Sequence, residues 1–543
     1  MKTRGFLVVI IALAFLSRVI AIGEPAFYYD EASHALRTGL ILEGNSTWQI
    51  MAHYPPLSLW INAISALLLG INEFSLRLVA AIFGTLTVIL VFFLAKRWYT
   101  TKEAILASTL IAILPLHVIF SRFAFVDVVA TFFIVFAIYL VEQKKHFVLS
   151  GIVFGMAFLT KYSTLLLWLL YWAYIFSHKL FEDKKSKGYY KEKLSSFVLT
   201  NLASFTVVIL STGFKFVNLF YLAYGVVYSA IIQTVSGYDT PLFLLIALFD
   251  SLSPLLYACT LLSFIYLLAF DRERRSTKLL LFLNLSFLVI AVLQARTSLR
   301  HLVIITPFLV IVLARFLTLV LQSKKIKRSL AFAVFALIIS SAAAWTFYEV
   351  SVDMDYTVWR EVGIFLDTYP DVAVYSIYPN FPLSIRLPNS TDISYYTNKK
   401  TYSKPDPLEF KEGDLIVMAN FSEKNFYTYQ EPMKNNLLFY RIKAIEPYPI
   451  IANFVENNGK LIKIFYCEEK PCLFVYELGY IDNETKESLA QEEWSLFPIE
   501  KKQEFFEMSC DRLKKFHLDK ITSILPPNLS NQINEKCSKV KNV

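Results

Sequence analysis

The sequence predicts a polytopic α-helical membrane protein with a C-terminal α/β domain outside the membrane. Of the 543 residues, 56% are hydrophobic and only 18% are charged. The mean hydropathy is +0.48, and this composition is more apolar than that of ordinary soluble domains. The apolar residues come in runs long enough to cross about 30 Å of hydrocarbon as helices of about 20 residues.

Eleven runs are expected to span the membrane, at residues 6–22, 75–95, 104–121, 127–142, 147–161, 164–178, 196–212, 243–269, 279–295, 302–321 and 329–346. The first run has a short basic prefix but lacks a small-residue cleavage pattern, so we interpret it as a retained signal-anchor helix. Two further apolar stretches, 57–70 and 217–233, are short and are expected to lie in the membrane interface. The alternative for 57–70 is a twelfth span, which would reverse every later loop.

Basic residues predict the orientation of these helices. With eleven spans, every cluster of Lys and Arg falls on one side of the membrane, at 2–4, 96–102, 144–145, 179–193, 272–278 and 324–328. By the positive-inside rule that side is the cytoplasm. The N-terminus is therefore expected in the cytoplasm, and the loops at 23–74 and 213–242 are expected outside. Because this clustering also accounts for the net charge of +9, no nucleic-acid partner is expected.

The membrane domain is expected to cover residues 1–346, and residues 347–543 are expected to form an extracytoplasmic α/β domain. Apolar residues at helical spacing predict a helix at 356–369. Strands are predicted from alternating residues at 371–378, 413–420 and 460–467.

Adjacent carboxylates in the first outer loop are the leading candidates for chemistry. Asp30 and Glu31 follow Tyr29 and precede His53 in the loop at 23–74. On the residues alone, they are either capping or solvated carboxylates at the start of a helix, or a general base with its neighbour, or metal ligands.

A third candidate carboxylate, Asp127, lies at the outer mouth of the fourth span, close to Arg122. A carboxylate at the edge of an apolar helix is costly to draw inward and usually has a partner. The alternative to a functional role is an Arg122–Asp127 ion pair that only fixes the turn.

Three cations, Lys161, Arg296 and Arg300, lie in short outer turns, where the positive-inside rule disfavours them. Their clustering indicates that an anion is held there, and a phosphate at the membrane surface is the expected ligand. His53 and His301 are weaker candidates, since a lone interfacial histidine is more often structural.

Six motifs follow one another along about the first 345 residues: YYDEA (28–32), HYPPLSLW (53–60), NEFSLRLVAAIFGTLTV (72–88), SRFAFVDVVATFF (121–133), GMAFLTKYS (155–163) and LRH…P (299–307). Together they resemble the GT-C membrane glycosyltransferases of the protein O-mannosyltransferase and aminoarabinose-transferase type. The resemblance implies a sugar donor carried on dolichyl or undecaprenyl monophosphate and used on the outer face by an inverting transferase. The acceptor is expected to carry a hydroxyl group and to be a protein, a glycan or a lipid.

The resemblance and the charges together imply roles for the candidate residues. Asp30 is expected to take the proton of the acceptor hydroxyl, with Glu31 and Asp127 as supporting carboxylates. Lys161 and Arg300 are expected to offset the charge that develops on the leaving phosphate. Other residues expected at the substrate site are Arg296, His53, Tyr29 and Arg122. A divalent cation, Mg²⁺ or Mn²⁺, could be held by Asp30 and Asp127.

Two alternatives belong to other functional classes. A transporter or flippase of a lipid-linked sugar would show carboxylates or broken helices near mid-membrane and repeated halves, whereas the polar residues here gather on one face and no repeat is seen. A membrane-anchored exterior binding protein with a vestigial loop would not need Asp30, Asp127, Lys161 and Arg300 intact. The sequence has no P-loop and no cytoplasmic nucleotide-binding domain, which argues against a transport ATPase or a cytosolic nucleotide-sugar enzyme.

Overall fold

The structure is a computed structural model, which describes residues 2–25, 27, 29–44, 55–180, 187–235, 252–293, 299–323, 328–351, 357–369, 373–377, 401–402, 407–419, 449–467 and 470–495. The chain forms two compact units, one of residues 1–357 with 427–442 and one of residues 358–426 with 443–543. The first unit is helical, and the second contains a five-stranded β-sheet.

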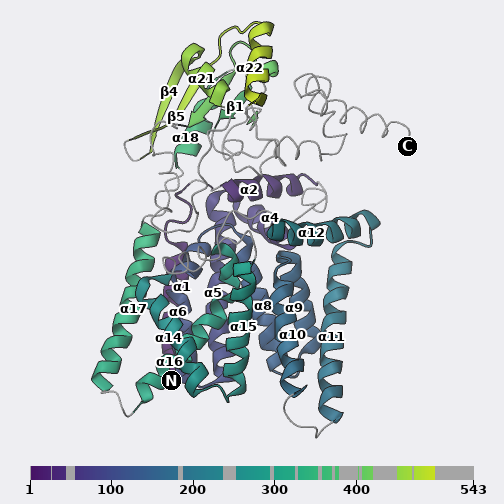
Figure 1. Cartoon of the computed structure of the whole chain (residues 1–543), viewed down its shortest axis with the longest axis vertical. Helices are drawn as coiled ribbons and strands as arrows, with labels where there is room; N and C mark the ends of the chain where they lie inside the picture. Colours follow the sequence, from purple (N-terminus) through teal and green to yellow (C-terminus); the bar gives the residue numbers. More distant parts are fainter. Residues whose placement is uncertain are drawn as a thin grey trace. The chain divides into compact units, whose positions relative to one another are not determined.

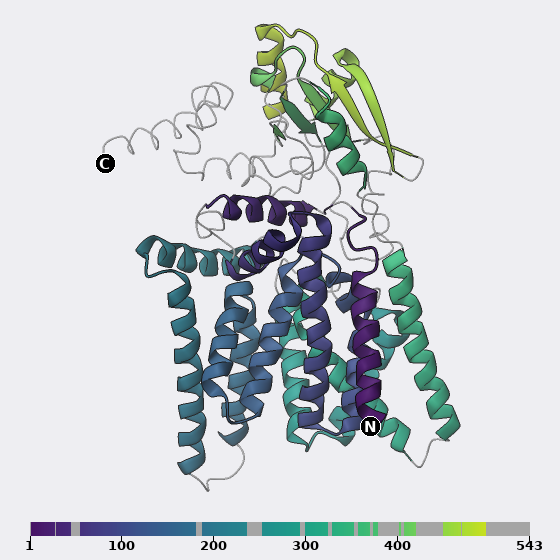
Figure 2. The same cartoon turned by 180° about the vertical axis from the view of Figure 1, so that it is seen from behind.

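Helices run side by side through the first unit (Figures 1 and 2). They are α1 (Lys2–Val19), α5 (Glu73–Trp98), α6 (Thr101–Ala112), α7 (Pro115–Phe120), α8 (Val126–Glu142), α9 (Phe147–Thr160), α10 (Thr164–Leu180), α11 (Lys187–Ser211), α14 (Pro254–Phe270), α15 (Arg275–Leu293), α16 (Thr306–Gln322) and α17 (Arg328–Ser351). Helix occupies most of the described part of every range expected to span the membrane.

Three helical stretches among the described residues are long and apolar enough to cross a membrane on their own, Glu73–Trp98, Glu192–Ser211 and Arg300–Gln322. Several shorter apolar helices accompany them. These helices support the predicted multi-pass membrane protein, while the number of eleven crossings stays a prediction.

The predicted span at 104–121 is two helices rather than one. α6 ends at Ala112 and α7 begins at Pro115. Proline has no N–H to continue a helix, and its ring disfavours helical geometry at the residue before it. Leu114 is accordingly extended, with φ −70° and ψ 116°. The prediction of one continuous helix is therefore wrong.

Two helices, α2 (Tyr29–Leu42) and α12 (Phe216–Val235), lie across one end of the bundle, and α4 (Leu57–Leu69) lies at the same end (Figures 1 and 2). α4 has 13 residues, so it is only about 20 Å long at 1.5 Å per residue. Its place at the end of the bundle, with α2 and α12, favours the predicted interfacial helix over a twelfth span. Gly70 ends α4 at φ +79°, a left-handed conformation that glycine adopts without strain.

α9 packs tightly against α11 because two glycines face the contact. A Cβ atom at Gly151 would come within 2.1 Å of the carbonyl oxygen of Thr200, and one at Gly155 within 3.1 Å of the carbonyl oxygen of Ser204. Glycines four residues apart let two helix backbones approach closely in a membrane. The contact holds α9 in place, and Lys161 lies directly after this helix.

The second unit contains a mixed sheet with the strand order β2-β1-β3-β5-β4. β1 pairs in parallel with β2 and β3, and β5 pairs antiparallel with β3 and β4. The strands are β1 (Val374–Ile377), β2 (Thr401–Tyr402), β3 (Leu415–Ala419), β4 (Lys460–Cys467) and β5 (Lys470–Glu477), and the helices are α18 (Thr357–Leu366), α21 (Pro449–Asn458) and α22 (Asn483–Ser495). The predicted strands are confirmed as β1, β3 and β4, and the predicted helix as α18.

β5 was not expected from the sequence, although it lies between two other strands. Pro471 near its start argues against a central strand, because proline cannot donate to the ladder. The structure accommodates Pro471 opposite Tyr466, next to an irregularity of the β4–β5 pairing. The strand-forming residues that follow then pair regularly with β3.

Candidate active site

A short segment between α7 and α8, residues 121–127, brings several predicted site residues together. It follows the helix break at Pro115 and enters the first turn of α8. Contacts reach it from α1, from the first turn of α2, from the end of α9 and from η1, a 3₁₀ helix at Leu299–Ile305.

Glu31 is completely buried and binds Arg77 through both carboxylate oxygens. Arg77 donates from Nε to Oε1 at 2.8 Å and from Nη2 to Oε2 at 2.7 Å. The backbone N–H of Ala124 donates to the same Oε1 at 2.6 Å. A planar guanidinium matches a carboxylate in this two-point geometry, which fixes orientation as well as charge. Glu31 therefore attaches the first turn of α2 to α5 and to the 121–127 segment.

Arg77 itself is fixed by the start of α5. Asn72 and Ser75 form a reciprocal capping box, with the N–H of Ser75 donating to Asn72 Oδ1 at 2.9 Å and the N–H of Asn72 to Ser75 Oγ at 3.2 Å. Arg77 also donates from Nη1 to the carbonyl oxygens of Ile22 and Pro25 at 2.7 and 2.8 Å. One guanidinium thus holds the α1–α2 connection as well as Glu31.

Arg77 was not among the site residues predicted from the sequence. A usable signal was present, because Arg77 is a cation at the outer end of a predicted span, as Lys161 is. The pairing itself was not predictable from spacing, since 46 residues separate Arg77 from Glu31.

Asp127 and Lys161 form an ion pair in which the ammonium group donates to Oδ1. Their side chains are 5% and 16% exposed. Asp127 lies in the first turn of α8 and Lys161 is the residue that ends α9. The helix dipoles favour an anion at the first position and a cation at the second. Two of the predicted site residues are therefore in direct contact.

The expected alternative was an Arg122–Asp127 ion pair. The described contacts of these two residues do not include it, so this prediction is wrong. Arg122 donates from Nη1 to the carbonyl oxygens of Ile20 at 2.8 Å and Ser17 at 3.3 Å. These carbonyl groups lie at the C-terminal end of α1, where a cation is favourable. Arg122 thus attaches the 121–127 segment to α1, and Asp127 pairs with Lys161.

Arg300 reaches the same segment from η1. Its guanidinium carbon lies 5.6 Å from the centroid of the Phe125 ring, within cation–π range, and the residue is half-buried. The two cations expected to bind phosphate, Lys161 and Arg300, therefore contact residues 127 and 125 of one short segment.

The remaining predicted residues are described only in part. Tyr29 and Asp30 lie in the first turn of α2, next to Glu31, but their side chains lie outside the described residues. His53 and Arg296 also lie outside the described residues.

Only one of the two predicted metal ligands, Asp127, has a described side chain. The part of the chain that the structure describes contains no group of three or more His, Cys, Asp or Glu side chains that could hold a metal. Asp127 already binds an ammonium group, which would repel a divalent cation at the same carboxylate. The metal site expected at Asp30 and Asp127 stays a prediction.

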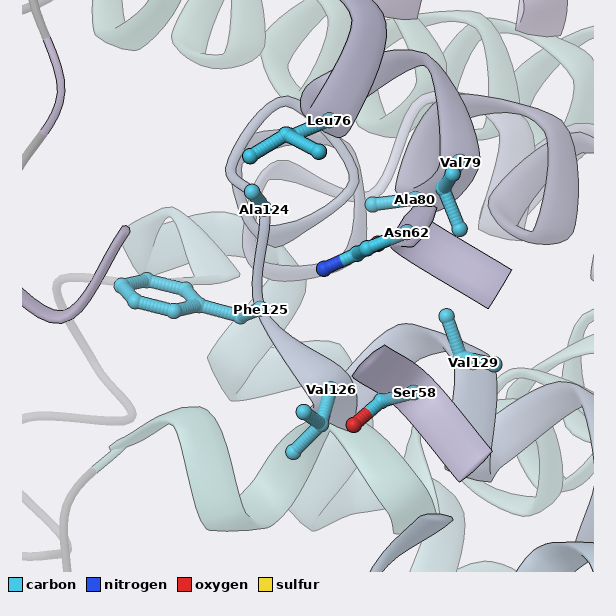
Figure 3. A pocket seen from close by; sticks show the side chains of 9 residues that line it. All are labelled: Ser58, Asn62, Leu76, Val79, Ala80, Ala124, Phe125, Val126 and Val129. Atoms are coloured by element: carbon cyan, nitrogen blue, oxygen red, sulfur yellow. The ribbon is translucent and has the colours of Figure 1, made fainter. Parts of the chain in front are cut away.

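A small hollow with room for about one water molecule lies beside the 121–127 segment (Figure 3). Ser58 and Asn62 of α4 are its polar lining residues. The apolar lining residues are Leu76, Val79 and Ala80 of α5, Ala124 and Phe125 of the segment, and Val126 and Val129 of α8.

A second cluster of buried charges lies at the other end of α5, where the guanidinium carbon of Arg315 is 5.1 Å from the ring centroid of Tyr99, the residue that ends α5. We call it the far-end cluster and define it as Glu103, Asp271 and Arg315. Arg315 donates to Glu103 at 2.9 Å and to both oxygens of Asp271 at 3.1 and 2.9 Å. Thr277 donates to Asp271 at 2.5 Å, and Thr100 donates to Glu103. This cluster was not predicted from the sequence.

Comparisons with known proteins agree with this fold. Residues 53–205 match the family model described as dolichyl-phosphate-mannose-protein mannosyltransferase. An uncharacterised protein of Aquifex aeolicus (strain VF5) is 35% identical over 147 residues, 25% of this chain and 29% of that one. A second from the same organism is 27% identical over 168 residues, 30% of this chain and 40% of that one. The matches thus span less than half the length of these relatives.

Solved structures match over most of the chain. ArnT from Cupriavidus metallidurans bound to undecaprenyl phosphate matches with a TM-score of 0.55 and 12% identity, over 87% of this chain and 98% of that chain. The oligosaccharyltransferase AglB from Archaeoglobus fulgidus, in complex with an inhibitory peptide and a dolichol-phosphate, matches with a TM-score of 0.53 and 12% identity, over 80% and 72% of the two chains. The resemblance to GT-C membrane glycosyltransferases predicted from the sequence is thereby confirmed, and the chain has their fold.

Proposed function

We propose that this chain is an inverting glycosyltransferase that moves a sugar from a polyprenyl monophosphate to a hydroxyl-bearing protein, glycan or lipid acceptor. The observation that carries the proposal is the meeting of Lys161, Asp127 and Arg300 on the 121–127 segment. Support comes also from the fold, because the similar structures of ArnT and AglB hold undecaprenyl phosphate and a dolichol-phosphate.

Lys161 and Arg300 bind the phosphate of the donor in this proposal. In the reaction, the bond between the sugar carbon C1 and the phosphate oxygen breaks, and its electron pair stays on the phosphate. The two cations offset the negative charge that develops there. Asp127 holds the Lys161 ammonium group in position through their ion pair.

Asp30 takes the proton of the acceptor hydroxyl, whose oxygen forms the new bond to C1 on the face opposite to the phosphate. This geometry inverts the configuration at C1 and needs a single carboxylate base. Support comes from the place of Asp30 in the chain, next to Glu31. The buried Glu31–Arg77 pair fixes the helical turn that carries Asp30.

The reaction is proposed to take place on the extracytoplasmic side. The N-terminus of α1, the end of α5 at Lys96 and Arg97, and the α14–α15 connection near Arg274 lie at the end of the bundle opposite to α2 and α12 (Figures 1 and 2). Basic residues gather at that end, which supports a cytoplasmic assignment for it. The candidate site lies at the other end.

The test is sugar transfer in purified membranes, with radiolabelled polyprenyl-phosphate sugars and nucleotide sugars offered separately. We expect incorporation from the lipid-linked donor alone, and its loss in Asp30→Asn with the protein still folded. Glu43→Gln is the matched control, because Glu43 is exposed just beyond the C-terminal end of the same helix. Retained transfer in Asp30→Asn would remove that residue from its role. Movement of labelled lipid across the bilayer without transfer would instead support a flippase.

A further inference from the structure

Arg18 of α1 is a buried cation to which the proposed reaction gives no role. Its side chain is completely buried, and in the part of the chain that the structure describes it binds no carboxylate. A charge without a counter-ion inside an apolar bundle is costly, so it indicates a specific role. The described partners of Arg18 are backbone carbonyl oxygens, the Ser17 hydroxyl and His117, and the role must lie with these groups.

The helix break at Pro115 leaves carbonyl oxygens at the end of α6 without helical partners. In a continuous helix the N–H of residue 115 would bind the carbonyl oxygen of Ile111, but proline has no N–H. Arg18 supplies the missing donors, from Nη2 to the carbonyl oxygen of Ile111 at 3.3 Å and from Nη1 to that of Ala112 at 3.2 Å. A cation is also favourable at the C-terminal end of a helix. Arg18 therefore caps α6 at the break.

The same guanidinium binds the other side of the break. Nη2 of Arg18 donates to Nδ1 of His117 in α7 at 3.0 Å, and His117 is completely buried. A guanidinium can only donate, so Nδ1 accepts. Because Nη2 also donates to Ile111 of α6, one nitrogen atom joins the two helices. The planar guanidinium has a fixed geometry, so this bond fixes the direction in which α7 leaves α6.

α7 leads directly into the 121–127 segment. Ser121 donates from Oγ to the carbonyl oxygen of His117 at 2.5 Å. Arg122 donates back to carbonyl oxygens of α1, so α1 holds α7 at both ends. The segment placed in this way contacts Lys161 and Arg300, the two cations that bind phosphate in the proposed function.

We propose that Arg18 and His117 are positioning residues for the phosphate site. Their bond across the helix break sets the place of the 121–127 segment, and through it the relative positions of Lys161 and Arg300. The inference rests on the proposed function, in which these two cations hold the phosphate of the donor. Arg18 and His117 do not touch the ligand, because both are completely buried.

The test compares two substitutions of His117. His117→Asn keeps an acceptor oxygen near the position of Nδ1, whereas His117→Leu has none, and both leave Arg18 bound to α6. The measurement is binding of undecaprenyl monophosphate to the purified full-length protein in lipid nanodiscs, at a temperature where every variant is folded. We expect His117→Leu to weaken binding about tenfold, the effect of one hydrogen bond to a charged group. His117→Asn should bind as the wild type does.

Hydrogen exchange without lipid gives a readout that does not depend on the ligand. The N–H of Ala124 is bound to Glu31, so its exchange reports the place of the 121–127 segment. We expect faster exchange of this segment in His117→Leu and unchanged exchange in His117→Asn. A residue that only stabilised the fold would raise exchange in α11 as well.

Thr346→Val is the matched control at the same helix break. Thr346 of α17 donates to the carbonyl oxygen of Ile113 at 2.6 Å, and its described hydrogen bonds do not include one to α7. The variant should lower the unfolding midpoint and leave the affinity for undecaprenyl monophosphate unchanged.

Gly84→Ala provides a variant that leaves both proposed residues in place. A Cβ atom at Gly84 of α5 would clash with Oγ of Ser121 and would lie 3.1 Å from Nε of Arg18. The variant should weaken lipid binding too, and it keeps the inference testable if His117→Leu fails to fold. Gly5→Ala is its control, because a Cβ atom at Gly5 meets no described atom within 4 Å.

Three results would overturn the inference. The first is wild-type affinity and exchange in His117→Leu. The second is an equal loss in His117→Leu and His117→Asn, since the acceptor atom would then have no effect. The third is a loss of affinity in Thr346→Val as large as that in His117→Leu. If the wild type does not bind the lipid, the proposed function fails, and exchange still decides whether the Arg18–His117 bond places the segment.

Discussion

Ion pairs of different kinds lie near the two ends of α5. At the far-end cluster, the guanidinium of Arg315 makes three hydrogen bonds to two carboxylates, and each carboxylate also accepts from a threonine hydroxyl. At the candidate site, Asp127 is bound by Lys161 through a single ammonium group. An arginine fork is rigid, whereas a lysine is a point charge on a flexible stem. The ammonium group of Lys161 can therefore contact a phosphate while Asp127 holds it in position, whereas the multiply bonded guanidinium of Arg315 is committed to its carboxylates.

The same contrast exists within the candidate site. The Glu31–Arg77 pair resembles the far-end cluster, because it is two-pointed, buried and bonded to backbone groups as well. The Asp127–Lys161 pair contacts the same 121–127 segment, and its exposure of 5% and 16% is close to that of Arg315 and Asp271, at 11% and 13%, so the difference lies in the hydrogen-bond geometry. We infer that arginine pairs with several hydrogen bonds hold the bundle together at both ends, and that the lysine pair takes part in ligand binding.

The largest effect is expected for Arg77→Met, which should destabilise the fold. Removing one partner of a buried ion pair leaves the other charge uncompensated, which costs about 3–5 kcal/mol. The measurement is the unfolding midpoint of the purified protein in detergent. Arg97→Met is the matched control on the same helix, because Arg97 is exposed, and it should change the stability by less than about 0.5 kcal/mol.

The double variant Glu31→Leu with Arg77→Met sharpens this prediction. Removing both charges avoids the buried unpaired carboxylate, so the double variant should be more stable than Arg77→Met alone. A double variant that is less stable than the single one would show that the pair is not the source of the loss. In that case the comparison with the far-end cluster would not hold.

Lys161→Met should lower sugar transfer strongly and the stability of the fold only weakly, the opposite of Arg77→Met. Loss of one electrostatic contact to the developing charge lowers transfer by about 10²–10³-fold. The fold should lose less stability than in Arg77→Met, because the N-terminus of α8 still favours the Asp127 charge and Lys161 is the more exposed partner of its pair. Transfer from the lipid-linked donor and the unfolding midpoint are measured on the same preparations. Lys215→Met, an exposed lysine between α11 and α12, is the control and should change neither.

Lys161→Arg provides a further check on the role of this position. Arginine keeps the positive charge but replaces the point charge by a fork, so we expect partial recovery of transfer relative to Lys161→Met. A Lys161→Met protein that is as unstable as Arg77→Met would mean that the two pairs have the same structural role. The proposed distinction between the arginine pairs and the Asp127–Lys161 pair would then be wrong.

Apolar runs and single charges were readable from the sequence, because each depends on neighbouring residues. The helices follow from runs of apolar residues, and Asp127, Lys161 and Arg300 stood out as charges in apolar surroundings. The helix break at Pro115 followed from the same local rules and was missed. Pairings between distant residues were not readable: Glu31 accepts from Ala124 across 93 residues, and Arg315 binds Glu103 across 212. Such contacts are set by helix packing, which leaves no spacing signal in one sequence.

The smallest expected effect is a change with pH in the stability that the far-end cluster contributes. Burial acts to raise the pKa of Asp271, but hydrogen bonds from Arg315 and Thr277 outweigh it and hold this pKa below its usual value. A carboxyl group whose pKa is lowered by folding contributes stability that is present above its unfolded pKa of about 3.9 and is lost as the pH falls through the folded value.

The difference in unfolding midpoint between the wild type and Asp271→Asn should therefore be constant above about pH 5 and shrink as the pH falls below about 4. The measurement is a series of thermal unfolding curves of both proteins, at pH values from above about 5 to below about 4. Asp482→Asn gives a matched comparison in the second unit, where Asp482 accepts from the N–H of Thr485 at the start of α22 and its pKa is also lowered. A difference for Asp271 that grows on acidification would mean that its ionised form is not what stabilises the cluster, and Arg315 would then hold Glu103 alone.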